Sequence, residues 1–288
     1  MNLPTQNPTL PPVGTCTLIY AHRGAMAYRP QNTMPAFQLA WEMGVAGVEL
    51  DVQCSKDGVP IVFHDDTLDA LTNGTGCVHD HHASDLLQLD AGSHFSQEYA
   101  NTTIPTLAEV LRARPAHTLV NIEIKTAFPF FPIQEDDPRL LQGHPLLTEA
   151  TNSATEKEAQ RTARQTIDCI QQLAHELPDL IAHLIISSFH PAALVEFERL
   201  MPEVTLGVLR CRTAVYDSAP RMAAIQHSAL HLNSEDVTRE IVQEAHKNEL
   251  YVNCWTVNDI EKARTLIYWG VDGIISNVPD AMLKILNK

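Results

Sequence analysis

Two carboxylates, Glu49 and Asp51, interrupt the apolar run 45–52, where a buried strand has no use for charge. Residues two apart in a strand point to the same side, so both carboxylates aim together. They repel each other unless protons or a cation neutralise them. A third carboxylate, Glu123, stands in the apolar run 118–124. Three carboxylates form an oxygen-rich site suited to Mg²⁺ or Ca²⁺, and the Cys and His spacings typical of zinc are missing.

Two cationic side chains and two histidines fall at the ends of similar apolar runs. His22 and Arg23 directly follow one such run, and His64 ends another. Lys125 lies two residues after Glu123, so the two share a side. Arg23 and Lys125 would supply positive charge to an anionic substrate. The histidines titrate near neutral pH and can move protons.

The elements that must position these residues alternate along the chain. Apolar runs predict strands at 18–21, 45–52, 118–124, 183–188, 204–209, 229–232, 250–255 and 272–276. Helical patterns lie between them, clearest at 155–177, 191–201, 234–248 and 258–269. Strand then helix, eight times, predicts an α/β fold of the (β/α)8 TIM-barrel type. Active sites of such barrels lie at the C-terminal ends of the strands, where the polar side chains fall.

The alternation breaks at about residues 52–103, a stretch that is largely polar and rich in Gly, His and Asp. We interpret it as a small inserted subdomain after the second barrel strand. Residues 1–16 are expected to be loose, and 17–288 to form the barrel domain. The polar, proline-containing segment 127–154 is expected to be a long loop. The histidines at 79, 81 and 82 are expected to be solvated rather than to form a second metal site.

Composition narrows the classes of function. A chain of 288 residues suits one large domain, and a net charge of −15 argues against a nucleic acid as the main partner. No apolar run is long enough for a membrane span, and no secretory leader is recognisable, so we expect no stable membrane insertion. Six cysteines without paired spacing indicate free thiols in a reducing compartment. A cytoplasmic protein is expected, with its oligomeric state open.

The chemistry-bearing residues stand in a series of motifs that resembles the glycerophosphodiester phosphodiesterase family. The series reads H-R-G at 22–24, P-x-N-T at 30–33, E-x-D at 49–51, V-x-H-D at 62–65, T-N-G-T-G at 72–76, E-I-K at 123–125, S-F at 188–189, W-T-V-N at 255–258 and D-G-I-I-S-N at 272–277. Each motif alone is weak, but the ordered set is specific. In one departure, Gln31 stands where the family usually has Glu, which leaves open any role of a negative charge there.

The resemblance implies metal-dependent hydrolysis of a glycerophosphodiester, a small molecule, to an alcohol and sn-glycerol 3-phosphate. It implies that Glu49, Asp51 and Glu123 are metal ligands. His22 and His64 would be the general acid/base pair, and we favour His22 as the base and His64 as the acid. In the family, a hydroxyl of the substrate's own glycerol is thought to attack first, giving a cyclic phosphate that water opens.

The remaining expected site residues bind the substrate. Arg23 and Lys125 would contact the phosphate, and Trp255 at a strand end would wall the glycerol pocket. The sequence does not identify the alcohol that leaves.

Other interpretations remain open. A lysophospholipase D-like or sphingomyelinase-like phosphodiesterase could share the barrel and metal site. Glu49 and Asp51 could form ion pairs with Arg23 and Lys125 without a metal. A catalytically inactive barrel used for binding is expected to lack one of the acid/base or metal-site residues, and this chain has them all.

Overall fold

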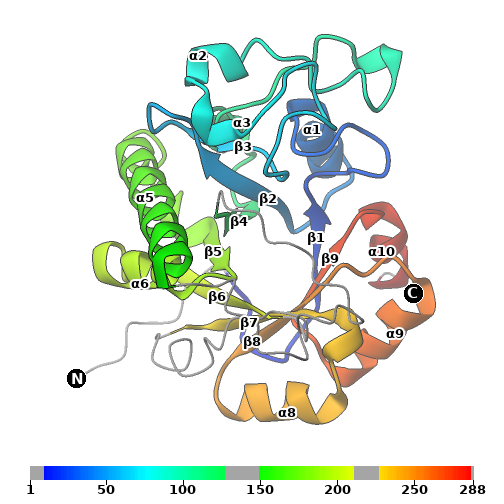
Figure 1. The fold of residues 1–288 in the computed structure, drawn as a ribbon. Coiled ribbons are helices and arrows are strands. Elements are labelled where there is room, and N and C mark those ends of the chain that lie inside the picture. Colours follow the sequence, from blue (N-terminus) through cyan, green and yellow to red (C-terminus); the bar gives the residue numbers. More distant parts are fainter. Residues whose placement is uncertain (1–9, 127–148, 211–226, 287–288) are drawn as a thin grey trace, which may run out of the picture.

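The computed structural model describes residues 10–126, 149–210 and 227–286, with side chains from residue 155 onward in the second segment. Within these ranges, eight parallel strands close into a barrel, each paired with the next and the last with the first (Figure 1). In order around the barrel they are β1 (Leu18–His22), β2 (Gly47–Cys54), β4 (Leu119–Ile124), β5 (Leu184–Ser188), β6 (Thr205–Arg210), β7 (Ala229–Asn233), β8 (Tyr251–Trp255) and β9 (Gly273–Ser276). The predicted (β/α)8 TIM barrel is confirmed.

Helices surround the barrel (Figure 1). They are α1 (Met34–Glu42), α3 (Leu107–Ala113), α5 (Glu149–Ala174), α6 (Pro191–Leu200), α8 (Arg239–Lys247), α9 (Ile260–Trp269) and α10 (Pro279–Leu286). Local signals explain where several begin. Thr106 and Glu109 form a reciprocal capping box at α3, and the backbone N–H of Ala192 donates to Nδ1 of His190 ahead of Pro191 at α6.

Strand β2 shows how alternation divides core from site. Val48, Leu50 and Val52 are fully buried in the main hydrophobic cluster, which also contains residues of the surrounding helices. Glu49 and Asp51 lie on the other face of the strand, toward the barrel interior. Because side chains alternate along the strand, the apolar ones face the helices and the carboxylates face the barrel mouth.

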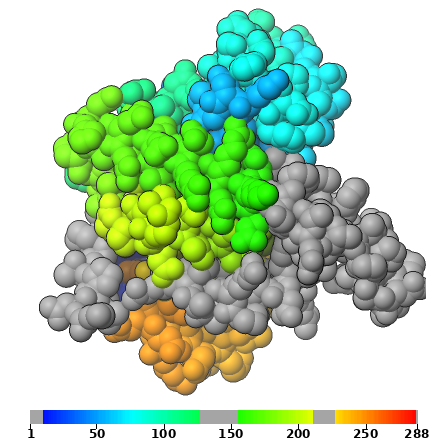
Figure 2. Space-filling view, turned by 60° about the vertical axis from the view of Figure 1, so that its left-hand side comes forward, coloured from blue at the N-terminus to red at the C-terminus, as the bar shows by residue number. Residues whose placement is uncertain are grey.

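Residues 55–106, between β2 and α3, form what we call the lobe. Strand β3 (Pro60–Val62) pairs antiparallel with the end of β2, so β2 continues to Cys54 instead of ending at residue 51 or 52 as predicted. The lobe also contains η1 (Val78–Asp80), α2 (Ala83–Leu86) and η2 (Gln97–Tyr99), and it has a small apolar core of its own. Arg161 of α5 donates to the carbonyl of Ser55 at 2.7 Å, which ties the base of the lobe to the helical layer. Figure 2 shows the lobe protruding beyond α5.

Two predictions about irregular segments have different outcomes. Most of the predicted loop 127–154 lies outside the described residues, but its last six residues, 149–154, are helical and belong to α5, so the loop prediction is wrong there. Residues 10–16, expected to be loose, contact the barrel. The Tyr251 hydroxyl donates to the Pro11 carbonyl at 2.9 Å, and the Gly14 N–H donates to the Asp272 carboxylate at 2.6 Å. These hydrogen bonds hold the segment across the N-terminal end of the barrel, away from the polar site.

Candidate active site

The turn after β1 explains why His22 and Arg23 are followed by glycine. Arg23 has φ 52° and Gly24 has φ 76°, so two successive residues adopt the left-handed conformation. A Cβ on Gly24 would lie 2.6 Å from the backbone carbonyl carbon of Ala36 in α1. A side chain there is excluded both by backbone conformation and by contact. The sharp turn directs the Arg23 side chain over the end of β2.

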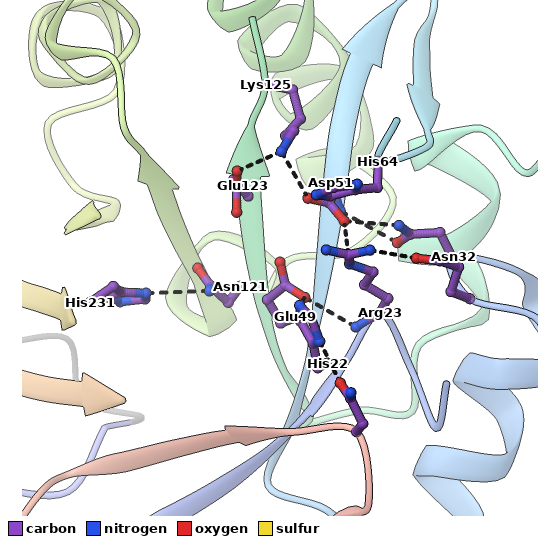
Figure 3. A network of polar contacts seen from close by, with 12 residues as sticks. His22, Arg23, Asn32, Glu49, Asp51, His64, Asn121, Glu123, Lys125 and His231 are labelled. Carbon is purple, nitrogen blue, oxygen red and sulfur yellow. Dashed lines mark hydrogen bonds and ion pairs between the residues drawn. The ribbon is translucent and has the colours of Figure 1, made fainter. Parts of the chain in front are cut away.

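Three carboxylates converge at the mouth of the barrel (Figure 3). Glu49 and Asp51 of β2 are 3% and 1% exposed, and Glu123 of β4 is half-buried. One oxygen from each lies within 4.8 Å of the other two. The parallel register that pairs Asp51 with Glu123 brings the third carboxylate to the two on β2.

Cationic side chains neutralise part of this charge. Nε of Arg23 lies 3.3 Å from Oδ2 of Asp51, and Nζ of Lys125 lies 3.1 Å from Oε1 of Glu123 and 3.8 Å from Oδ1 of Asp51. Burial by itself raises the pKa of Asp51, but the charges of Arg23 and Lys125 help to hold it below its usual range.

Glu49 has a different environment. Its Oε2 accepts from the backbone N–H of Arg23 at 3.0 Å and lies 3.9 Å from Nε2 of His22, and within the described residues it forms no ion pair with a lysine or arginine side chain. Burial and the carboxylates of Asp51 and Glu123 raise the pKa of Glu49 well above its usual value. The ion-pair interpretation without a metal therefore accounts for Asp51 and leaves Glu49 uncompensated. A hard divalent cation fits this oxygen donor set.

Asn32 and Gln31 connect the P-x-N-T motif to the carboxylates and to Arg23. Nδ2 of Asn32 donates to Oδ2 of Asp51 at 2.9 Å, and Asn32 is buried with φ 55°. Asparagine tolerates this conformation better than most residues. Nη1 of Arg23 donates to Oε1 of Gln31 at 2.5 Å. Because Gln31 is neutral, it positions the guanidinium and leaves its charge available to the site.

His22 lies next to Glu49 with its ring held from β9 (Figure 3). Its Nδ1 contacts Oδ1 of Asn277 at 2.6 Å. The amide oxygen can only accept, so Nδ1 has the proton and Nε2 faces the carboxylates with a lone pair. Burial, followed by the charge of Arg23, lowers the pKa of His22 to about 4. His22 is therefore neutral at physiological pH.

His64 reaches the same carboxylates from the lobe and lies beside Asp51 in Figure 3. Its Nδ1 lies 2.7 Å from Oδ1 of Asp65, and both side chains are about one-third exposed. The hydrogen bond from His64 lowers the pKa of the Asp65 carboxyl. Asp65 thus holds the His64 ring through a carboxylate, whereas Asn277 holds the His22 ring through a neutral amide.

Trp255 ends β8 on the same face of the barrel. Its Nε1 donates to the carbonyl of His231 at 3.1 Å, which fixes the indole. The ring of Phe189 meets it edge-on, with centroids 5.6 Å apart. The two rings form one aromatic surface, and only Trp255 was expected from the sequence.

A buried polar layer crosses the barrel interior close to the carboxylates, and it was not expected from the sequence. His231 of β7 lies between Asn121 of β4 and Asn253 of β8, with nitrogen–nitrogen distances of 3.5 and 3.0 Å. Gly207 makes room for it, since a Cβ there would lie 2.5 Å from Nε2 of His231. Burial lowers the pKa of His231 to about 3.

Asn277 and Asp65 also received no role from sequence, although each stands in a quoted motif. The signal was present as D-G-I-I-S-N and V-x-H-D. Spacing alone could not show that Asn277 holds the ring of His22, which belongs to another motif, or that Asp65 holds the neighbouring His64.

In the described parts of the chain, every helix is too short or too polar to cross a membrane.

Comparisons with known proteins identify the family. The model of the glycerophosphoryl diester phosphodiesterase family matches residues 22–281. A glycerophosphodiester phosphodiesterase of Caldanaerobacter subterraneus is 33% identical over 94% of this chain and 98% of its own, and one of Bacillus altitudinis is 31% identical over 93% and 98%. Among solved structures, an Oleispira antarctica phosphodiesterase in complex with the product sn-glycerol-3-phosphate is 26% identical, with a TM-score of 0.75 over 95% of this chain and 98% of its own. The chain belongs to the glycerophosphoryl diester phosphodiesterase family, whose members are phosphoric diester hydrolases.

Proposed function

We propose that this protein hydrolyses glycerophosphodiesters to an alcohol and sn-glycerol 3-phosphate. A divalent cation, Mg²⁺ or Ca²⁺, would be bound by Glu49, Asp51 and Glu123. His22 and His64 would transfer the protons. The relative from Oleispira antarctica, solved with sn-glycerol-3-phosphate, supports this substrate class.

The balance of charge at the barrel mouth is the observation on which the proposal depends. With Glu49 ionised, as cation binding requires, the three carboxylates contribute −3 and Arg23 and Lys125 contribute +2, which leaves −1 facing an anionic substrate. A divalent cation changes this to +1. The site then attracts a phosphodiester and no longer repels it. When bound, the cation supplies Lewis-acid stabilisation of the charge on phosphorus-bound oxygens.

The different partners of the two histidines support different roles. Neutral His22, with its Nε2 lone pair directed toward the site, takes the proton from the glycerol hydroxyl next to the phosphate ester. That oxygen attacks phosphorus as the bond from phosphorus to the leaving alcohol oxygen breaks. His64, whose Nδ1 is held by the Asp65 carboxylate, gives a proton to the leaving oxygen. The products are a free alcohol and a cyclic phosphate.

The second step reverses the roles. His64, now neutral, takes a proton from water, and the water oxygen attacks phosphorus. The bond from phosphorus to the oxygen of the former glycerol hydroxyl breaks, and His22 returns its proton to that oxygen. The product is sn-glycerol 3-phosphate, and both histidines are back in their starting states.

Arg23 and Lys125 would contact the phosphate oxygens, and Trp255 would line the pocket for glycerol. Trp255 suits this role because its ring has an apolar face and its N–H is already bonded to the His231 carbonyl. The substrate is a small molecule, and no nucleic-acid partner is proposed. A cytoplasmic location stays a prediction.

Variants at the two histidines test the mechanism. His22→Ala and His64→Ala should each slow turnover of glycerophosphocholine by about 10²–10⁴-fold, the usual contribution of general acid–base catalysis. Both variants should still bind Mg²⁺ in a calorimetric titration, because neither imidazole is a proposed ligand. Glu49→Gln should lose both metal binding and turnover.

A substrate panel in the same assay identifies the leaving alcohol. It should contain choline, ethanolamine, glycerol and inositol diesters, with lysophosphatidylcholine to test the lysophospholipase D-like alternative. If the His64→Ala variant turns over the best substrate at the parent's rate, the proposed mechanism is wrong and the lobe only covers the pocket.

A further inference from the structure

The lobe contains a second group of potential metal ligands, which the proposed function does not use. Cys77, His79 and Asp80 lie on and next to the short helical turn η1. A thiol sulfur, an imidazole nitrogen and a carboxylate oxygen from these residues all lie within 4.8 Å of one another. Cys77 is a free thiol, so its sulfur is available.

His79 differs from the two histidines next to it. His81 is engaged, with Nε2 3.0 Å from the Thr75 carbonyl, and His82 is exposed and lies 3.9 Å from Asp57. Nε2 of His79 lies 3.7 Å from Oδ1 of Asp80, another member of the group, and the His79 ring is about one-third exposed. The other ring nitrogen, Nδ1, is buried and has no hydrogen-bond partner within the described residues. Nε2 therefore faces the Asp80 carboxylate, as a shared metal ligand would.

The charge around the thiol favours a cation. The carboxylates of Asp66, Asp69 and Asp80 lie close enough to act electrostatically on the thiol of Cys77. The same negative charges would lower the energy of a bound divalent cation. Binding would displace the thiol proton, as is usual for a thiolate ligand.

The ligand types identify the class of metal. Mg²⁺ and Ca²⁺ take oxygen ligands, whereas zinc and its borderline-soft relatives accept sulfur, nitrogen and oxygen. Bond lengths of roughly 2.0–2.3 Å put tetrahedral ligands about 3.3–3.8 Å apart. Side-chain movements of about 1 Å would therefore close the present arrangement, and water would complete the fourth position.

A comparable group at the other end of the barrel is already engaged. His117, Asp179 and His183 also lie close together. There, however, the Asp179 carboxylate accepts from Arg114 at 3.2 Å, and Nδ1 of His183 is bonded to the Asp179 carbonyl at 2.7 Å. In the lobe group, by contrast, the printed ion pair joins two members of the group itself, Nε2 of His79 and Oδ1 of Asp80.

We propose that Cys77, His79 and Asp80 bind a zinc-type divalent cation on the lobe, separate from the oxygen site in the barrel. Cys77 forms an antiparallel bridge with Thr67, three residues after His64. A bound cation would therefore fasten the segment that follows His64 to η1. This site does not depend on the proposed phosphodiesterase mechanism.

The most specific probe of the lobe site is Co²⁺. It is added to the reduced full-length protein in the presence of excess Mg²⁺, which fills the barrel site. A Co²⁺–thiolate bond gives near-ultraviolet charge-transfer absorption that an all-oxygen site cannot give. We expect this band in the parent and its loss on addition of one equivalent of Zn²⁺. It should persist in Glu49→Gln, which separates the lobe site from the barrel site.

Variants assign the band to residues. Cys77→Ser should abolish it, and His79→Ala should weaken Co²⁺ binding by at least about tenfold, since even an indirect partner of a metal ligand is worth 10–100-fold. Cys16→Ser and His82→Ala are matched controls that alter an exposed thiol and an exposed histidine. Circular dichroism checks that each variant is folded. The proposal is overturned if the parent shows no band, or if Cys77→Ser retains it.

Discussion

Asn32 offers a sharp test of how the barrel carboxylates are held. Its side-chain amide donates to Oδ2 of Asp51 at 2.9 Å inside the protein. Asn32→Gly removes this amide and leaves a residue that readily adopts the φ of 55° found there. The substitution therefore removes the hydrogen bond to a proposed ligand with little backbone strain.

The size of the effect can be worked out in two ways. A hydrogen bond to a charged group contributes about 1.5–3 kcal/mol. At about 1.4 kcal/mol for each factor of ten, that corresponds to roughly 10- to 150-fold. Loss of a residue that orients a metal ligand typically weakens metal binding by about 10–100-fold. We therefore expect the Mg²⁺ dissociation constant of Asn32→Gly to rise by about 10–100-fold.

Calorimetric titration of Mg²⁺ into the metal-free protein measures this change. Asn101→Gly is the matched control, because Asn101 also has a positive φ of 65° but is exposed in the lobe. It should bind Mg²⁺ as the parent does. An Asn32→Gly dissociation constant equal to that of the parent would refute the idea that this amide positions Asp51 for a cation.

Three further perturbations have defined outcomes. Asp65→Asn should lower kcat by about 10²-fold or more, within the range for general acid–base catalysis, and leave Mg²⁺ affinity unchanged. Rate measurements and calorimetric titration check the two expectations. Glu123→Gln should weaken Mg²⁺ binding, and an unchanged isotherm would remove Glu123 from the ligand set. Acid should destabilise the fold through His231. The His231 side chain takes up a proton below about pH 6.5 in the unfolded chain but only near pH 3 in the folded chain. The free energy of unfolding should therefore fall as the pH drops from about 6.5 to about 3, by up to about 5 kcal/mol. Denaturant unfolding against pH should show a smaller acid loss in His231→Gln.

The sequence was most informative where periodicity and motif order agree. Alternation in β2 correctly put Glu49 and Asp51 on one face, and the strand rhythm predicted the barrel. The end of β2 was placed too early because its last residues pair with β3, a contact that a local pattern cannot reveal.

Contacts between residues far apart in the chain were not predicted, for a similar reason. Asn277 lies 255 residues from His22, and only closure of the barrel brings them together. His231 was overlooked because one polar residue in an apolar run looks like an exposed position. Its burial depends on the space left by Gly207 and on amides from two other strands.

The metal requirement of turnover tests the account most directly. Glycerophosphocholine hydrolysis should be followed by phosphorus NMR, first with exhaustively chelated protein whose metal content has been measured, and then after adding Mg²⁺ or Ca²⁺. We predict no formation of sn-glycerol 3-phosphate without metal and recovery with one of the two cations, because the empty site presents three carboxylates to an anionic substrate. Full turnover by the metal-free protein would contradict the assignment of Glu49, Asp51 and Glu123 as metal ligands.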